Sequence, residues 1–494
     1  MRFVILWSDL FFWLLFVASS LFFLYAVVKK PLFRQNFCRL LESRVAVICF
    51  SLLTAFFLIA LTDSVHFQLK LEKTDSQNQQ DNYQIEPISV LDWLLSPLGV
   101  QKETTYSAPF SLYSATKETL ETSFGVVRDY PRLQYAGQHI AEDSERSADI
   151  LSKSLMGAGY GLITWLVFVA VVTGLIGIIS RQSPVRWAKQ VFSGRSRFAI
   201  RGFLIIWLLI FLLAHTAIYL SRYYHVLGTD AVGQDVLFLS LKAIRSSLLI
   251  GTLPTLVLLP IAIWLGLIAG YFRGIADDIV QYIYTTLNSI PGILLIAAAI
   301  LVMQVTIDTH TEWFQTATQR ADLRLLALCV VLGATGWTTL CRLIRAESLK
   351  LRELEFVQAA KVFGVSNYTI LKRHLLPNLF YIISISVVMD FSGLVLAEAV
   401  LSYVGIGVDP TMISFGTMIN MARLEMARDP IVWWSLVSAF VFLVTIVLSA
   451  NLLADAIYDA FDPRSRLIDR QYTQSRFTKL RCLFLAQIEK RPAQ

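Results

Sequence analysis

The chain has 494 residues, of which 55% are hydrophobic and only 16% are charged, and its mean hydropathy is +0.59. Ordinary soluble domains contain roughly a quarter charged residues, so this composition excludes a typical soluble globular protein. The net charge of +7 does not indicate nucleic-acid binding, because the basic residues form short blocks beside apolar runs, as the positive-inside rule predicts. We therefore predict an all-α polytopic membrane protein without a nucleic-acid partner.

The N-terminal part contains three apolar runs, at 4–28, 45–61 and 155–180, each long enough to cross about 30 Å of hydrocarbon as a helix. One arginine precedes the first run and four basic residues follow it closely, which places its amino end outside and argues against a cleaved signal peptide. The segment between the second and third runs is acidic, so we predict an extracytoplasmic loop or small domain there.

Six further apolar runs bring the prediction to about nine spanning helices, with the N-terminus outside and the C-terminus in the cytoplasm. These six runs are centred on Leu208, Leu258, Leu294, Leu328, Val388 and Val441. The predicted units are the first two helices (1–62), the acidic segment (63–154), the third helix with a basic cytoplasmic linker (155–202), a six-helix unit (203–466) and a basic cytoplasmic tail (467–494).

A charged segment, residues 349–378, interrupts the apolar pattern between two spans on the predicted cytoplasmic side. Phe356, Ala359, Ala360 and Phe363 recur at helical spacing, so two aromatic and two small side chains share one face of a short helix. The groove of a partner protein could receive that face closely. The pattern alone fits equally well an amphipathic connector that lies on the bilayer surface.

A second short helix is predicted to follow in the same segment. Gly364 can end the first helix in the left-handed conformation, and Ser366 can cap the second. Pro377 is predicted to end this second helix, because proline is a common stop signal. The segment is therefore expected to form a helix-turn-helix outside the bilayer.

This segment resembles the EAA loop of ABC importer permeases, in which Glu-Ala-Ala is followed by three residues, glycine, nine residues and Ile-x-Leu-Pro. Residues 358–360 read Gln-Ala-Ala and precede Gly364 at the family's spacing, and residues 374–377 read His-Leu-Leu-Pro. Gln358 replaces the family's glutamate. His374 replaces the isoleucine and is similar to the version of the motif found in peptide permeases.

Other segments resemble motifs of the dipeptide/oligopeptide/nickel permease family, in the family's order. They are His225 to Asp230 with Gly233 and Asp235, Gly270 to Phe272 with Asp277, Glu398 to Gly407, Ser414 to Gly416, and Asn451 to Arg464. Gln234 replaces an arginine of the first motif, and Arg273 replaces a glycine that follows the second. Ordered motifs at family spacing identify the chain as a member of this family, with an unusual extension at residues 1–202.

The resemblance implies a non-catalytic, C-subunit-like permease of a bacterial inner membrane that forms half of an import pathway for di- or oligopeptides. It implies a heterodimer with a second, homologous permease in membrane lipid, two ABC ATPase subunits that carry the ATP and Mg²⁺, and an extracytoplasmic substrate-binding protein. No cofactor is expected on this chain. The residues implied to dock on the ATPase are Phe356, Gln358, Ala359, Ala360, Phe363, Gly364, His374 and Pro377.

Ionisable residues within predicted spans are costly and often mark a transport pathway. Asp390 and Glu398 are such candidates, Asp390 being the better one, because Glu398 could instead lie near the outer interface, solvated or paired. Span parity places four further motif residues on the outer side. These candidates for an external gate or for contacts with the binding protein are Thr229, Asp230, Asp235 and Gly416.

The sequence contains no P-loop and no nucleophile elbow, so hydrolysis of ATP by this chain is not expected. Its five cysteines and six histidines lack metal-ligand spacing, which predicts neither a disulfide framework nor a metal site. The alternatives that remain are a permease for antimicrobial peptides, an exporter with the same fold, and a non-transporting sensor or scaffold whose outer segment is the functional part.

Overall fold

The computed structural model describes residues 2–70, 84, 86–122, 125–140, 143–180, 199–313 and 316–461. Most of the predicted basic linker, the predicted basic tail and the Asp-Pro-Arg end of the last motif lie outside these residues.

Nine helices in the described part of the chain are long and apolar enough to cross a membrane, and each corresponds to one of the apolar runs of the sequence. They are α1 (Trp7–Lys29), α3 (Arg44–Asp63), α6 (Arg146–Ser180), α8 (Ile200–Leu220), α9 (Val236–Phe272), α11 (Gly292–Thr309), α12 (Ala317–Arg352), α15 (Leu376–Val404) and α17 (Trp434–Phe461). The predicted all-α polytopic fold is confirmed.

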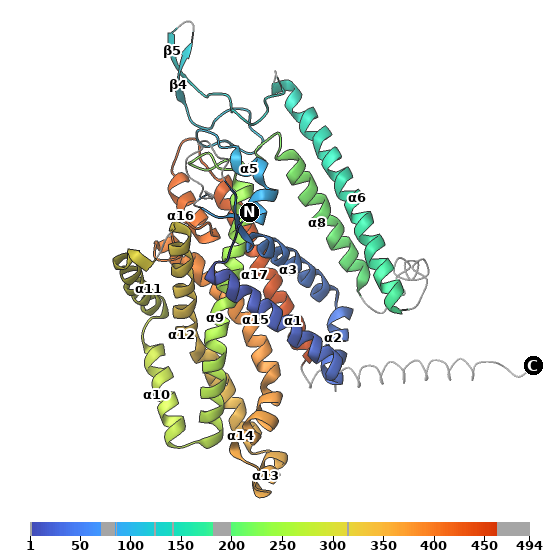
Figure 1. The fold of residues 1–494 in the computed structure, drawn as a ribbon, viewed down its shortest axis with the longest axis vertical. Helices are drawn as coiled ribbons and strands as arrows, with labels where there is room; N and C mark the ends of the chain where they lie inside the picture. Colours follow the sequence, from blue (N-terminus) through green and yellow to red (C-terminus); the bar gives the residue numbers. More distant parts are fainter. Residues whose placement is uncertain are drawn as a thin grey trace, which may run out of the picture.

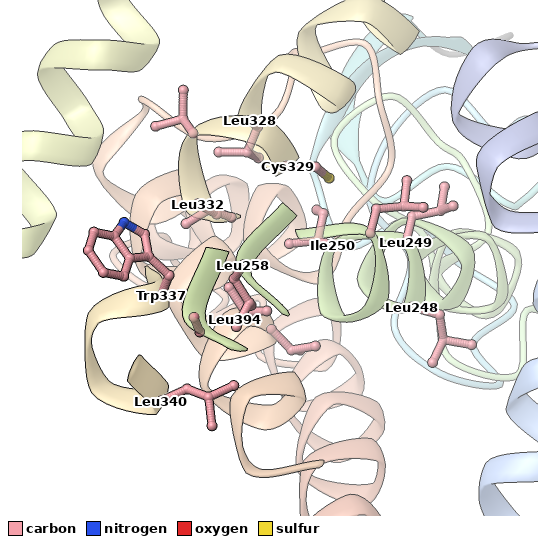
Figure 2. Close-up of a cluster of buried hydrophobic side chains, with 14 of the residues drawn as sticks. Leu248, Leu249, Ile250, Leu258, Leu328, Cys329, Leu332, Trp337, Leu340 and Leu394 are labelled. Carbon is pink, nitrogen blue, oxygen red and sulfur yellow. The ribbon is translucent and has the colours of Figure 1, made fainter. Parts of the chain in front are cut away.

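The centre of the bundle is the contact between α9 and α12. Small residues let the two backbones approach closely: a Cβ added at Gly270 of α9 would lie 2.8 Å from the carbonyl oxygen of Arg345 on α12. Buried side chains from α9, α12 and α15 fill the remaining space, as Figure 2 shows for Leu258, Trp337 and Leu394. These three helices therefore form one packed core.

The N-terminal extension packs on this core. Helix α3 lies against α9 and α17, and the short helix α2 (Pro31–Glu42) connects α1 to α3. Leu40 of α2 packs with Ala460 near the end of α17. Helices α6 and α8 form a close pair along one side of the bundle (Figure 1). The sequence predicted α1, α3 and α6 but not α2, which is too short to span a bilayer.

One end of the bundle, called here the hairpin end, carries most of the loop that joins α3 to α6 (Figure 1). This extension loop (residues 64–145) contributes two strands to a three-stranded antiparallel sheet of order β1-β2-β3, in which Phe67 pairs with Phe3 and Ile88. The short elements at this end are β1 (Arg2–Val4), β2 (His66–Gln68), β3 (Ile88–Ser89), α4 (Val90–Leu94), α5 (Ser96–Val100), β4 (Glu118–Thr122), β5 (Gly125–Asp129), η1 (Asp143–Glu145), η2 (Thr311–Trp313) and α16 (Phe415–Glu425).

The opposite end, called here the α13 end, carries the charged segment 349–378 (Figure 1). Its short elements are α10 (Ile275–Ser289), α13 (Glu355–Val362), α14 (Asn367–Ile370) and the π-helical turn η3 (Leu371–Leu375). The helix-turn-helix of the sequence prediction corresponds to α13 and α14, and α14 lies beside the last turns of α9, where Tyr368 stacks on Trp264.

Candidate functional site

The turn between α13 and α14 has the conformation that the sequence predicts. Gly364 adopts a φ of 74°, and the next amide donates a hydrogen bond to the Ala360 carbonyl at 3.1 Å, which closes α13. Ser366 caps α14 by accepting the amide of Thr369. A Cβ added at Gly364 would meet no neighbour within 4 Å, so the backbone conformation alone requires glycine there.

Helix α13 has one face on the bundle and one face in the open. Val357 and Ala360 are buried in the main core cluster, whereas Val362 and Phe363 are 84% and 85% exposed. Ala360 therefore does not share an open docking face with Phe363, and that part of the prediction is wrong. Helical spacing shows which residues share a face, but the packing of α13 on the bundle decides which of them remain accessible.

The second family motif meets the charged segment at the end of α9. The Gln358 amide group donates to the Arg352 carbonyl at 3.0 Å, and the Arg352 guanidinium donates to the Tyr271 carbonyl at 2.8 Å. The Tyr271 hydroxyl in turn donates to the Asn367 side-chain oxygen at 2.8 Å. Residues from two motifs thus join α13, the end of α9 and the start of α14.

Arg273, which stands where the family has glycine, adopts a φ of 56° and a ψ of −174°. Side chains are strained in this region of backbone conformation, which is normally reserved for glycine. The guanidinium of Arg273 pairs with Glu353 at 2.8 Å and so holds the α9–α10 turn against the α13 segment. Close by, Arg345 donates to Asp277, and this hydrogen bond lowers the pKa of the Asp277 carboxyl.

Pro377 does not end the second short helix, contrary to the sequence prediction. Helix α14 continues through the π-helical turn into α15, and Pro377 lies in the first turn of α15. The wider turn removes the requirement for a regular hydrogen bond from the proline nitrogen, so the helical path is not interrupted. His374 lies in this turn, with its ring 6.3 Å from that of Phe356.

At the hairpin end, the first motif is covered by the extension loop. His225 is buried between two carboxylates, with Nδ1 2.8 Å from Asp235 and Nε2 3.4 Å from Glu103 of the extension loop. Glu103 also accepts the backbone amides of Gln134 and Tyr135, each at 2.8 Å. Burial opposes protonation of His225, but the hydrogen bonds to Asp235 and Glu103 outweigh it and raise its pKa to about 9.

Thr229 of the same motif forms a second connection. Its hydroxyl donates to the Thr105 carbonyl at 2.9 Å and accepts the Ser107 amide at 2.6 Å. Its carbonyl accepts the indole N–H of Trp434 at 2.9 Å. Thr229 and Asp235 are both buried, so neither offers a surface for contact with a binding protein, and their assignment to an external gate stays a prediction. Asp230 is half-buried and accepts the amides of the turn that it begins.

Glu398 is fully buried at the joint between α15 and α16. Its Oε1 accepts hydrogen bonds from the hydroxyls of Ser402 at 2.7 Å and Ser414 at 2.8 Å. Gly416 packs against it, because a Cβ there would lie 2.9 Å from the same oxygen. Glu398 therefore does not face an open pathway and is not solvated, and Gly416 offers no surface to a partner. Asp390 is half-buried and remains the pathway candidate.

Polar pairs that tie the extension to the core were not found from the sequence. Besides Glu103 with His225, the Tyr106 hydroxyl donates to Glu425 at 2.5 Å, and Arg245 pairs with Asp9 at 2.7 Å. The signal available for the last pair was a charged residue within each of two apolar runs. Among the described residues, no group of three or more His, Cys, Asp or Glu side chains is arranged to hold a metal ion.

Comparison with known proteins points to one family. Residues 262–467 match the sequence model of the binding-protein-dependent transport system inner membrane component. The chain is similar to the oligopeptide transport system permease protein OppC of Mycobacterium tuberculosis (strain ATCC 25618 / H37Rv), with 32% identity over 246 residues, 50% of this chain and 78% of the relative.

Two further relatives have similar coverage. The glutathione transport system permease protein GsiD of Pectobacterium atrosepticum is 32% identical over 49% of this chain and 73% of its own length. The dipeptide transport system permease protein DppC of Bacillus subtilis is 28% identical over 49% of this chain and 69% of its own length. Among solved structures, a chain of the MetNI methionine ABC transporter matches with 18% identity and a TM-score of 0.33, over 44% of this chain and 92% of that chain.

Proposed function

The chain belongs to the family of binding-protein-dependent inner-membrane transport components, and from this premise we propose that it is the C-type permease subunit of an ATP-driven peptide importer. Relatives named for oligopeptides, dipeptides and glutathione support this substrate class, because glutathione is itself a tripeptide. The chain forms half of the pathway, and a second homologous permease forms the other half.

The observation that carries the proposal is the geometry of α13. Its inner face is fixed in the core through Val357 and Ala360, while its tip presents Val362 and Phe363 almost fully to the surroundings. Apolar side chains exposed to this extent on a rigid element are typical of a protein-protein contact. We assign this tip to the groove of a cytoplasmic ATPase subunit, which carries the ATP and Mg²⁺.

Movement of the ATPase reaches the bundle by two routes. The first runs from Arg352 to the Tyr271 carbonyl and hence into α9. The second runs along α14, the π-helical turn and α15, which follow one another without a break at Pro377. Because helices transmit displacement without absorbing it in backbone torsions, α13 acts as a lever on both α9 and α15.

The orientation of the chain follows from these assignments. The α13 end faces the cytoplasm, and the hairpin end with the extension loop faces the outside of a bacterial inner membrane, which agrees with the charge pattern of the sequence. The N-terminus then lies outside. A substrate-binding protein on that side meets the extension loop, because the loop covers the motif residues Thr229 and Asp235.

Asp390 is proposed to face the translocation pathway. It lies within α15, is half-buried, and has neither a hydrogen bond nor an ion pair in the described part of the chain. An ionisable side chain within a spanning helix and without a partner is costly unless it faces water or substrate. The shared boundary between the two permease subunits would provide that environment.

The proposal is tested by reconstituting this chain with its partner permease, the ATPases and the binding protein in proteoliposomes. ATP-dependent accumulation of a labelled dipeptide is the expected result, and an Asp390→Asn variant should lower its rate. ATP-driven release of preloaded peptide would instead identify an exporter. Absence of any ATPase from the purified complex would favour the non-transporting sensor or scaffold.

A further inference from the structure

A cavity of about 350 Å³ lies at the hairpin end, where the extension meets the core. Asp63 at the end of α3 and His66 of β2 line it from the extension. Arg245 of α9 and Asp322 of α12 line it from the core. The extension thus supplies part of the wall, and residues 1–261 lie outside the family match. Its volume is within the range of small-molecule sites and far exceeds that of a single ion.

The cations in the wall of this cavity are already paired. Arg245 donates through Nε and Nη2 to Asp9, at 2.9 and 2.7 Å, and His66 lies 3.1 Å from the other oxygen of Asp9. Lys242 pairs with Asp92 at 2.7 Å. The carboxylate that Arg245 contacts is therefore Asp9, and not either of the two carboxylates described next, Asp63 and Asp322.

Two buried carboxylates in the wall have no cation of their own. Asp63 is 2% exposed and accepts one hydrogen bond, from the Ser89 hydroxyl at 2.7 Å. Asp322 is 3% exposed and, among the described residues, accepts only the amide and the hydroxyl of Ser8. Within the described residues, neither carboxylate forms an ion pair. Arg245 lines the same cavity, but the contacts of its guanidinium are with Asp9.

The wall of the cavity therefore contains more buried carboxylates than cations paired with them, and this excess of negative charge indicates what the cavity binds. Buried charges are retained when they are paired and hydrogen-bonded, and an unpaired buried carboxylate is costly. A cation placed in the cavity would complete the pairing of both Asp63 and Asp322. In the described part of the chain, no group of three or more His, Cys, Asp or Glu side chains is arranged to hold a metal ion. The size of the cavity favours an organic cation.

We propose that this cavity binds the primary ammonium group of a small organic molecule, through Asp63 and Asp322. An ammonium group has three donors, enough to bond both carboxylates, and such charge-assisted hydrogen bonds are stronger than neutral ones. The amino terminus of a short peptide and a simple amine both supply this group. The site goes beyond peptide import, because the extension helps to form it and binding requires no ATPase.

The test measures binding to the full-length chain in lipid nanodiscs by calorimetry. The probes are trialanine, N-acetyltrialanine and n-butylamine. Trialanine should bind, and acetylation should weaken its binding roughly tenfold or more, because it removes the charged donor. Binding of butylamine as well as trialanine would assign the site to amines in general, whereas binding of trialanine alone would assign it to peptide amino termini. Equal binding of the acetylated peptide would overturn the proposal.

Variants locate the binding within the molecule. Asp63→Asn and Asp322→Asn should each weaken trialanine binding about tenfold, whereas Asp143→Asn, an exposed carboxylate at the same end, should leave it unchanged. Unchanged binding in both of the first two variants would overturn the proposal. The acetylation comparison uses the unaltered chain, so it remains decisive even where a variant does not fold. Peptide uptake is a separate measurement, so its failure and the failure of this site are distinguishable.

Discussion

The two ends of the bundle both carry family motifs, but the described part of the chain covers only one of them. At the hairpin end, His225, Thr229 and Asp235 are buried beneath the extension loop, which supplies partners to two of them. At the α13 end, Val362 and Phe363 are almost fully exposed, and no other described residue covers them. Motifs of one family therefore serve as an internal interface at one end and as an open surface at the other.

The two ends of the bundle therefore have different roles. The extension loop binds to the core through buried polar groups, which fix its position and enclose the motif residues His225, Thr229 and Asp235. The α13 end combines a fixed inner face with an apolar tip, which is the arrangement needed for transmitting movement. Changes at the hairpin end should therefore affect stability, and changes at the α13 end should affect coupling.

The largest expected effect is the opening of the hairpin end by Glu103→Ala. The change removes one partner of buried His225 and the acceptor of the Gln134 and Tyr135 amides. Breaking such a pair costs about 3–5 kcal/mol. The free energy of local opening, measured by hydrogen exchange at these two amides, should fall by that amount. Glu118→Ala on the exposed hairpin is the control and should have little effect.

The same interface should weaken at high pH. The pKa of His225 is raised from 6.5 to about 9. Its contribution to the stability of the folded chain is therefore fully present below pH 6.5 and is lost as the pH rises through about 9. This pKa shift corresponds to about 3 kcal/mol of folding free energy. The pKa of Glu103 is lowered from its ordinary value of 4.5. Its contribution to stability is therefore present above pH 4.5 and is lost as the pH falls through the lowered pKa.

Thermal unfolding in detergent from pH 5 to pH 10 measures this dependence. The unaltered chain should lose stability between about pH 7 and pH 10, whereas His225→Gln should be less stable at pH 6 and show a flatter profile over that range. Parallel profiles for the two proteins would show that His225 does not hold the extension loop through its charge.

At the α13 end, Gly364→Val should impair coupling. A side chain in the left-handed conformation costs roughly 1–2 kcal/mol, and a β-branched one is the least tolerated. The docked position of α13 should therefore be disfavoured about tenfold. Peptide uptake by the reconstituted complex should fall while membrane insertion stays normal. Gly364→Asn is the matched control, because asparagine tolerates a positive φ; equal uptake by both variants would argue against the lever.

The smallest expected effect is a gain of stability in Arg273→Gly. Glycine relieves the backbone strain of the φ of 56° at this position, which stabilises the folded chain by about 1 kcal/mol. The change also removes the ion pair with Glu353. The melting temperature in detergent should rise slightly. Arg273→Ala also removes the ion pair but keeps the Cβ, so it should not show this gain.

The features that the sequence predicted depend on local patterns. Apolar runs identify spans, and Gly364 and Ser366 act within one helical turn of their own positions. Pro377 misled the prediction, because its usual effect as a stop signal is cancelled by a π-helical turn that no simple periodicity reveals.

The features that the sequence did not reveal depend on distant partners. Glu103 and His225 are 122 residues apart, and Asp9 and Arg245 are 236 residues apart. No spacing rule connects such pairs, since their proximity results from how the extension packs on the core. The burial of Glu398 and Gly416 has the same origin, because α16 must fold back on α15 before either position is enclosed.

The most direct test of the open α13 end is retention of the ATPase by the purified complex. Val362→Ser with Phe363→Ser removes the apolar tip of α13, and Val126→Ser with Val127→Ser makes the same type of change on the exposed β-hairpin at the other end. ATPase should be lost from the first double variant and retained by the second. Full retention of ATPase by the α13 double variant would contradict the assignment of this tip as the docking surface.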